Sequence, residues 1–506
     1  MTKTGKALAI AASITAALAL TAMAGEDGFD PRKTYPAGEL REDLKTLWDM
    51  LQEGHAGLDR YTPAGVLKRG FEDAANSLTG PMTELDFYVK LLPLVAAIKD
   101  GHTRVQIPQA AAAYLDAQPV FFPFGLRFLD DKTCIFRNLS SNPAVKEGAE
   151  LLSINGMPMT DVLNELVPLI PSDAGIRTRP IRQLEFPAAF GRLLALRFGL
   201  PESYRIRLRP FRGGAIQEVS VPGIAGKDVV RILYERYPAS GRHDPLYELT
   251  FRGSAAVLTI RAFADDEAKG SLRYPEYLRA SFRVLEERGI TDLVIDLRDN
   301  GGGRDEYAKL LFAHIMDRPF SYYRALETRN DHYDLFRFTD EPKANQEEFA
   351  KQVTKNARGW FDVIGHPNSG VQQPEEPHFA GRVAILINGL SFSATGETTS
   401  MFHFHKKAVF FGEECGAGYY GNTSGFSVMA TLPKTRIQIR IPLVIYTMAV
   451  DGYPKDRGLV PDVPVTATIE DLLSGRDPVM ERALRRVAGS SERPSKVTRS
   501  GSERHF

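Results

Sequence analysis

The sequence predicts an α/β protein, and two observations lead to this class. Short apolar segments such as TDLVIDL and RVAILIN recur after about residue 245, and each has the length of one buried strand. Amphipathic segments of helical length, such as YPEYLRASFRVLEERGI, separate them. The hydrophobic fraction of 43% is that of an ordinary globular protein. Apolar strands that alternate with helices indicate a largely buried sheet covered by helices.

Length and charge limit the organisation of the chain and its partners. A chain of 506 residues is too long for one compact core, so we expect about two to four domains. Lysine plus arginine and aspartate plus glutamate each total 63, so the chain has no net charge to attract a polyanion. We therefore expect no nucleic-acid partner.

The first residues have the order of a secretory signal peptide. Lys3 and Lys6 precede an apolar stretch from Ala7 to Leu20, and small residues follow as far as Ala24. The alternative is a membrane anchor, but the stretch is short for a span and rich in alanine. We expect residues 1–24 to be removed on export, which predicts a periplasmic or secreted protein. We expect no membrane span in the remaining chain.

Residues 25–108 are predicted to form a helical bundle. Apolar residues recur at helical spacing between positions 40 and 51, and a second helix is expected to open at Pro63. A third helix should open at Thr83 and stop at Gly101, because a glycine can adopt the left-handed conformation that ends many helices.

Two larger segments and a tail follow. Residues 118–223 are predicted to form short strands, with a turn at Asn155-Gly156 and one helix after it. Residues 228–488 contain the alternating strands and helices of the α/β domain. Residues 489–506 have almost no apolar content and are expected to be disordered.

The chain has two cysteines, Cys134 and Cys415, far apart in sequence. Two cysteines exclude a disulfide framework, although a single bridge stays open. We expect two unlinked buried thiols.

Two short motifs are candidates for chemistry. INGLSFSATGE places Ser393 at the predicted start of a helix, where free backbone N–H groups favour a developing oxyanion. Alternatively, Ser391 or Ser393 only caps the helix. DLVIDLRDNGGG ends a strand in three consecutive glycines, whose N–H groups can approach a ligand closely. A simple tight turn needs fewer glycines, so this loop is a candidate oxyanion nest.

Together, these motifs resemble those of the tail-specific, or C-terminal processing, serine peptidase family. Its members have a strand that ends in an IDLR-x-N-x-GG loop and, further on, a nucleophile segment S-A-S-A-S-E. This chain has IDLRDNGGG and, about 90 residues later, SFSATGE. The resemblance continues through VFFGEECGAG and RGLVPDVPV. It implies a catalytic domain of the ClpP/crotonase-like α/β fold, with an N-terminal helical bundle and an inserted PDZ-like module, which GAELLSINGMPMTDVL resembles.

By this resemblance Ser393 is the nucleophile, and the N–H groups of Ala394, Gly301 and Gly302 are candidates for the oxyanion hole. Many members pair the serine with a lysine in a G-E-x-x-x-G-K-G segment. Here the matching segment is GEECGAGYYG, which puts Gly418 at the lysine position. A Ser/Lys dyad is therefore not expected.

Another branch lacks that lysine and includes the tricorn core and the interphotoreceptor retinoid-binding proteins. Its peptidase members use a histidine from far upstream, and IKDGHTRVQIP resembles its D-x-H-T segment. His102 is therefore the candidate general base, since imidazole, with a pKa near ~6.5, can accept a proton near neutral pH. The alternative is a histidine in a connecting loop. We interpret His55 as structural.

The same branch carries an acidic residue shortly before a segment that is GLVPD here. The resemblance favours Asp456 as the group that orients the imidazole; the alternatives are Asp451, Asp100, Thr103 and Glu397.

In the PDZ-like module, PFGLRF occupies the place of a loop that binds peptide carboxylates. Phe124, Gly125 and Leu126 are therefore candidate substrate-binding residues. The alternative is a degenerate module that only covers the cleft.

The sequence therefore predicts an exported serine-type peptidase that hydrolyses peptides or unfolded proteins through an acyl-enzyme. It predicts no metal or other cofactor, because no Cys/His/Asp grouping has ligand spacing. The oligomeric state stays open. One rival is a non-catalytic protein of the same fold that binds peptides or hydrophobic ligands. The other is a crotonase-like acyl-CoA enzyme, which the export signal disfavours because acyl-CoA is cytosolic.

Overall fold

The structure is a computed structural model that describes residues 29–129, 132–238, 244–266, 270–341 and 343–487. The predicted signal peptide, residues 1–24, and the predicted tail, residues 489–506, lie outside the described residues. Among the helices that are described, none combines the length and the apolar character that crossing a membrane requires.

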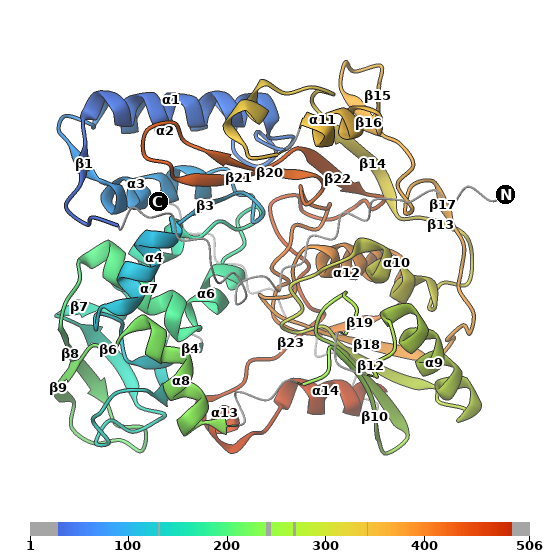
Figure 1. Cartoon of the computed structure of the whole chain (residues 1–506). Coiled ribbons are helices and arrows are strands. Elements are labelled where there is room, and N and C mark those ends of the chain that lie inside the picture. Colours follow the sequence, from blue (N-terminus) through green and yellow to red (C-terminus); the bar gives the residue numbers. More distant parts are fainter. Residues whose placement is uncertain (1–28, 130–131, 239–243, 267–269, 342, 488–506) are drawn as a thin grey trace, which may run out of the picture.

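The central element is a six-stranded sheet, which confirms the predicted α/β class (Figure 1). Its first two strands form an antiparallel hairpin, and all further neighbours are parallel. In spatial order the strands are β10 (Tyr247–Arg252), β11 (Ala255–Ile260), β12 (Asp292–Asp296), β18 (Arg382–Ile387), β19 (Val409–Gly412) and β23 (Val463–Pro464).

Helices cover both faces of this sheet. Leu293 and Ile295 of β12 face the apolar cluster that contains α9 (Tyr274–Glu287), α10 (Asp305–Ala313) and α12 (Ala394–Phe404). Val294 points the other way, to α14 (Pro478–Val487). Burial on both faces explains why these strands are continuous apolar runs in the sequence. It also places α12, which begins directly after Ser393, inside the domain.

The front of the chain forms the three predicted helices, α1 (Ala37–Gly54), α2 (Ala64–Asn76) and α3 (Glu84–Ala96). The expected stop at Gly101 is wrong, because α3 ends earlier and Lys99 takes the left-handed conformation, with φ of 61°. Gly101 has another role: a Cβ there would lie 2.7 Å from the ring of Phe392.

These helices do not have a core of their own. Leu44 of α1, Leu151 and Ile439 belong to one buried apolar cluster. That cluster joins the helices to two sheets. The first consists of β3 (Arg104–Gln106), β20 (Ser427–Thr431) and β21 (Gln438–Pro442). The second consists of β4 (Phe124–Leu129), β5 (Lys132–Asn138), β6 (Glu150–Ile154), β7 (Met157–Pro158), β8 (Ser203–Arg209) and β9 (Gln217–Pro222).

The predicted turn at Asn155-Gly156 is confirmed, since both residues have positive φ, at 50° and 88°.

The helices packed around the β4–β9 sheet are α4 (Gln109–Ala117), α5 (Met159–Leu166), η1 (Val167–Leu169), α6 (Thr178–Leu184), α7 (Pro187–Phe198) and α8 (Gly226–Arg236). Cys134 and Cys415 are buried and unlinked, as expected.

The remaining elements form smaller sheets and short helices. They are β1 (Thr34–Tyr35), β2 (Met82–Thr83), β13 (Phe320–Ser321), β14 (Tyr323–Thr328), η3 (Asp334–Phe338), α11 (Lys343–Ala350), β15 (Val353–Lys355), β16 (Phe361–Val363), β17 (Val371–Gln372), β22 (Val444–Met448) and α13 (Ile469–Ser474).

Candidate active site

Ser393 lies at the turn between β18 and α12, and its backbone is strained. Its φ of 58° and ψ of −126° fall in a region that residues other than glycine rarely adopt. Its hydroxyl does not cap α12, and the hydroxyl of Ser391 donates to the carbonyl of Leu297 at 2.8 Å. The capping interpretation is therefore wrong for both serines. A sharp, strained strand-to-helix turn is a known way to expose a nucleophilic serine.

The structure brings His102 to this serine across 291 positions of the sequence. Nε2 of His102 lies 3.1 Å from Oγ of Ser393, and both residues are buried. His102 sits on the loop between α3 and β3, and its ring stacks on Phe392 with centroids 4.6 Å apart. The residue before the serine therefore also holds the imidazole in place.

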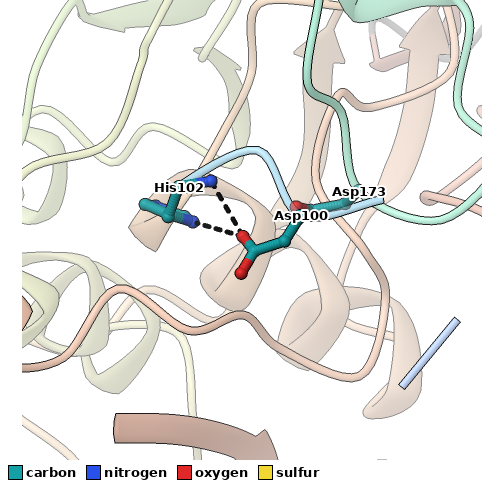
Figure 2. Close-up of side chains that lie close together, drawn as sticks. All are labelled: Asp100, His102 and Asp173. Carbon is teal, nitrogen blue, oxygen red and sulfur yellow. Dashed lines mark hydrogen bonds and ion pairs between the residues drawn. The ribbon is translucent and has the colours of Figure 1, made fainter. Parts of the chain in front are cut away.

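Asp100 is the carboxylate beside this imidazole (Figure 2). Its Oδ1 lies 3.8 Å from Nδ1 of His102 and accepts the backbone N–H of His102 at 2.8 Å. Nδ1 itself is buried without a hydrogen-bond partner among the described residues. Burial lowers the pKa of His102 to about 3, and Asp100 only partly opposes this. The imidazole is therefore neutral at neutral pH, which is the form that a general base must have before it takes a proton.

Asp100 is held as an anion by a second histidine. Nε2 of His55 lies 2.8 Å from Oδ2 of Asp100, and the hydroxyls of Thr103 and Thr423 donate to the same oxygen. Nδ1 of His55 accepts the N–H of Gly57 at 3.1 Å, so Nε2 carries the proton. Burial raises the pKa of Asp100, but its hydrogen bonds, above all the one from His55, bring it well below its usual range.

His55 was interpreted from the sequence as structural, and nothing in its local segment indicates this contact. Its neighbours in the site come from elsewhere in the chain, 45 or more positions away. The contact of His55 with Asp100 is therefore visible only in the folded structure and not in the local sequence.

A second carboxylate, Asp173, completes the group drawn in Figure 2. Ligand atoms of Asp100, His102 and Asp173 lie within 4.8 Å of one another, so distance alone would allow a cation. Both oxygens of Asp173, however, already accept backbone N–H groups, from Gly101 at 2.8 Å and Gly418 at 3.0 Å. Burial, and then Asp100, raise the pKa of Asp173 to about 6. We therefore assign the group to hydrogen bonding.

The structure does not bring Asp456 to the imidazole. Its side chain is exposed and makes no hydrogen bond or ion pair to His102 in the described part of the chain. Its backbone carbonyl accepts the N–H of Gly175 at 3.1 Å. Among the alternatives weighed from the sequence, Asp100 occupies the place expected for Asp456.

The glycine loop lies against the serine. A Cβ on Gly302 would approach Cβ of Ser393 to 2.7 Å, so only glycine fits there. The N–H of Gly302 donates to the side chain of Asn300 at 2.9 Å and is not free for an oxyanion. No acceptor within the described residues takes the N–H of Ala394 or Gly301. These two are therefore the available donors.

Phe124, Gly125 and Leu126 lie in β4, which is an edge strand of its sheet, and all three are buried. The edge is partly occupied, because Glu185 of α6 accepts the N–H of Phe128 at 3.0 Å. The three candidate substrate-binding residues make no hydrogen bond or ring contact with Ser393, His102 or Phe392 among the described residues, and the edge of their strand is partly occupied at Phe128.

The sequence of the α/β domain matches a known family. Residues 254–465 match the sequence model of peptidase family S41. The protein is therefore a serine-type peptidase, a hydrolase. The matched residues include Ser393 and the glycine loop but not His102, which lies upstream of them. No curated protein matches the sequence.

Solved structures show the same fold over most of the chain. Mature CPAF has a TM-score of 0.56 at 16% identity, and the match covers 89% of this chain and 96% of that one. A serine-to-alanine mutant of CPAF has a TM-score of 0.60 at 15% identity, with the same coverage. CPAF complexed with lactacystin has a TM-score of 0.57 at 16% identity and covers 89% and 97% of the two chains.

Proposed function

We propose that this S41 peptidase cleaves peptide bonds through an acyl-enzyme on Ser393, with His102 as general base. One observation carries the proposal: an imidazole nitrogen lies 3.1 Å from the hydroxyl of a serine whose backbone is strained. A base within hydrogen-bond reach of a serine can remove its proton as the oxygen attacks a carbonyl.

The proposed sequence of steps follows from the positions of the groups. Nε2 of His102 takes the proton of Ser393 as Oγ attacks the substrate carbonyl. The N–H groups of Ala394 and Gly301 stabilise the resulting oxyanion. His102 then gives the proton to the leaving amine, and water hydrolyses the acyl-enzyme with His102 again as base.

Asp100 is proposed to orient His102 and to stabilise the imidazolium that forms. Its Oδ1 is the carboxylate oxygen beside Nδ1, and His55 keeps it ionised. The 3.8 Å separation is longer than a hydrogen bond, and such contacts often tighten when substrate binds.

A lysine base is disfavoured on steric grounds. A Cβ on Gly418 would lie 2.4 Å from the hydroxyl of Tyr61, so a side chain at this position would require Tyr61 to move. Nζ of Lys407, just after the nucleophile helix, binds Asp317 instead at 2.9 Å. These contacts support membership of the branch that uses an upstream histidine.

We also propose that the chain is exported, on the evidence of its first 24 residues, and that the β4–β9 sheet is a PDZ-like module. N-terminal sequencing of the secreted or periplasmic product tests export. Cleavage after Ala24 is expected, and an intact N-terminus contradicts it.

Labelling with a fluorophosphonate tests the central proposal. The wild type should be labelled, Ser393→Ala should not be, and His102→Ala should be labelled more slowly by about 10²–10⁴-fold. His332→Ala is the matched control, because this histidine is 64% exposed and remote from the mechanism described above. Labelling that persists in Ser393→Ala contradicts the assignment. Absence of labelling in folded wild type favours the non-catalytic binding protein.

A further inference from the structure

Three arginines surround the proposed catalytic histidine. Arg104 lies in β3, two residues after His102, and Arg440 of β21 is its direct partner across the strands. Arg179 of α6 places its guanidinium 3.8 Å from the centre of the Phe392 ring, whose other contact is the imidazole of His102. After burial, which is the largest cause, the positive charges of all three arginines also lower the pKa of His102.

None of the three arginines forms an ion pair with an acidic side chain among the described residues, although the charges of Asp173 and Asp100 partly oppose the lowering of the pKa of Arg179 and of Arg440, respectively. Arg440 donates only to the hydroxyl of Ser427, at 3.0 Å. Nε of Arg179 is buried and has no hydrogen-bond partner in the described part of the chain. By contrast, Arg182, on the same helix as Arg179, pairs with Glu185 and Glu413.

This arrangement is costly for the free protein. Like charges directly opposite each other on neighbouring strands are destabilising, and Arg104 faces Arg440 in that way. Burial and Arg104 together lower the pKa of Arg440, and burial lowers that of Arg179 to about 10. Partly buried charges are normally paired, so an anion from outside the chain would relieve the repulsion.

We propose that Arg104, Arg179 and Arg440 form a subsite that binds a carboxylate group of the substrate close to the scissile bond. A carboxylate fits guanidinium donors in shape as well as charge, because an arginine can donate two parallel hydrogen bonds to it. The carboxylate can come from an aspartate or glutamate side chain or from the C-terminus of the peptide. The inference rests on the proposed function for the position of the scissile bond.

Binding to an inactive variant tests the subsite without any need for catalysis. Ser393→Ala is titrated with fluorescein-labelled peptides of three kinds, all derived from one neutral sequence. The first has a C-terminal amide, the second a free C-terminus, and the third an amide with glutamate introduced at each position in turn. At least one carboxylate peptide should bind about ten- to hundredfold more tightly than the neutral amide, and added salt should reduce the difference.

Substitution of the arginines then shows whether their side chains cause the preference for carboxylate peptides. In the Ser393→Ala background, Arg104→Gln and Arg440→Gln should each abolish most of the preference and leave binding of the neutral peptide within about twofold. Arg436→Gln is the control, because Arg436 is exposed at the turn between β20 and β21. Preference for the free C-terminus assigns the terminal carboxylate, and preference for glutamate assigns the side chain.

Two results would overturn the subsite: equal binding of all peptides, including no binding at all, or a preference that survives both substitutions. The outcome is separable from that of the proposed function. Arginine-dependent binding without fluorophosphonate labelling of wild type would retain the subsite and reject catalysis. Fluorophosphonate labelling of wild type without a preference for carboxylate peptides would retain catalysis and reject the subsite.

Discussion

Two buried carboxylates lie near the start of α12, and their surroundings differ. The two carboxylates are Asp100 and Glu397. Each accepts a hydrogen bond from one of two adjacent residues: Asn422 donates to Glu397 at 2.7 Å, and the hydroxyl of Thr423 donates to Asp100. We call these groups the Asp100 cluster (Asp100, His55, His102 and Thr423) and the Glu397 cluster (Glu397, Asp305, Tyr323, His366 and Asn422).

The Glu397 cluster is fully hydrogen-bonded around a neutral acid. The hydroxyl of Tyr323 lies 2.7 Å from both Glu397 and Asp305, yet it has only one proton to donate. A protonated Glu397 removes the conflict by donating to Tyr323, which in turn donates to Asp305. Burial, and then the charge of Asp305, raise the pKa of Glu397 to about 8. His366, 3.2 Å from Asp305, keeps that neighbour ionised.

The Asp100 cluster is different, because it keeps an anion and leaves Nδ1 of His102 without a hydrogen bond. It also adjoins the strained backbone of Ser393. Burial is similar in the two clusters, so the partners decide which carboxylate is ionised. The satisfied cluster is therefore expected to act on stability, whereas the incompletely satisfied one is suited to chemistry.

The largest expected effect is on catalysis, from the Asp100 cluster. Asp100→Asn removes the negative charge beside His102 and should lower kcat/KM by about 10²–10⁴-fold. The measurement is kcat/KM per folded molecule, with circular dichroism to establish folding. Asp305→Asn, in the other cluster, is the matched comparison and should act mainly on stability. Equal losses of kcat/KM in the two variants would remove the distinction between the clusters.

An intermediate effect is expected on stability, from the Glu397 cluster. A carboxyl whose pKa is raised on folding contributes fully below its unfolded pKa, near 4.5, and loses that contribution as the pH rises through about 8. Gln resembles the protonated acid, so Glu397→Gln should be the more stable protein at pH 9. Relative to pH 5, its advantage over wild type should grow by roughly 2–4 kcal/mol.

Denaturant unfolding at pH 5 and pH 9 measures this difference. Glu286→Gln, at an exposed position of α9, is the control and should show no such pH dependence. A Glu397→Gln protein that loses stability equally at both pH values would show that the carboxyl is ionised in the native state.

The smallest effect is expected outside both clusters. Asp456→Asn changes an exposed side chain without a contact to His102, so kcat/KM should stay within about twofold and stability within about 0.5 kcal/mol. Parallel assays of this variant and Asp100→Asn separate the two candidates for the orienting group. A loss at Asp456 as large as that at Asp100 would restore the prediction made from the sequence.

Local pattern was enough to predict much of the fold. The three front helices, the strands β12 and β18 and the helix after Ser393 all carry apolar periodicity or buried runs, which depend only on neighbours in sequence. The helix stop at Gly101 was wrong because that glycine is needed where the loop approaches Phe392, a contact that the local pattern does not contain.

The candidate site was only partly predictable, and the reason is distance along the chain. Resemblance pointed to Ser393 and His102, which do meet. The resemblance also pointed to Asp456, which does not reach the imidazole. The local sequence around His55 indicated only a structural residue, whereas His55 contacts Asp100. The pairing of Arg104 with Arg440 arises from the register of two strands over 330 positions apart.

Local sequence pattern was therefore sufficient for the class of fold and the positions of its main elements, and the motif resemblance was sufficient for the proposal that Ser393 and His102 react. Tertiary structure alone decided which carboxylate stands beside His102, which N–H groups stay free and where positive charge accumulates. The physical reason is that periodicity is local, whereas hydrogen bonding and electrostatics act between any groups that folding brings within a few ångströms.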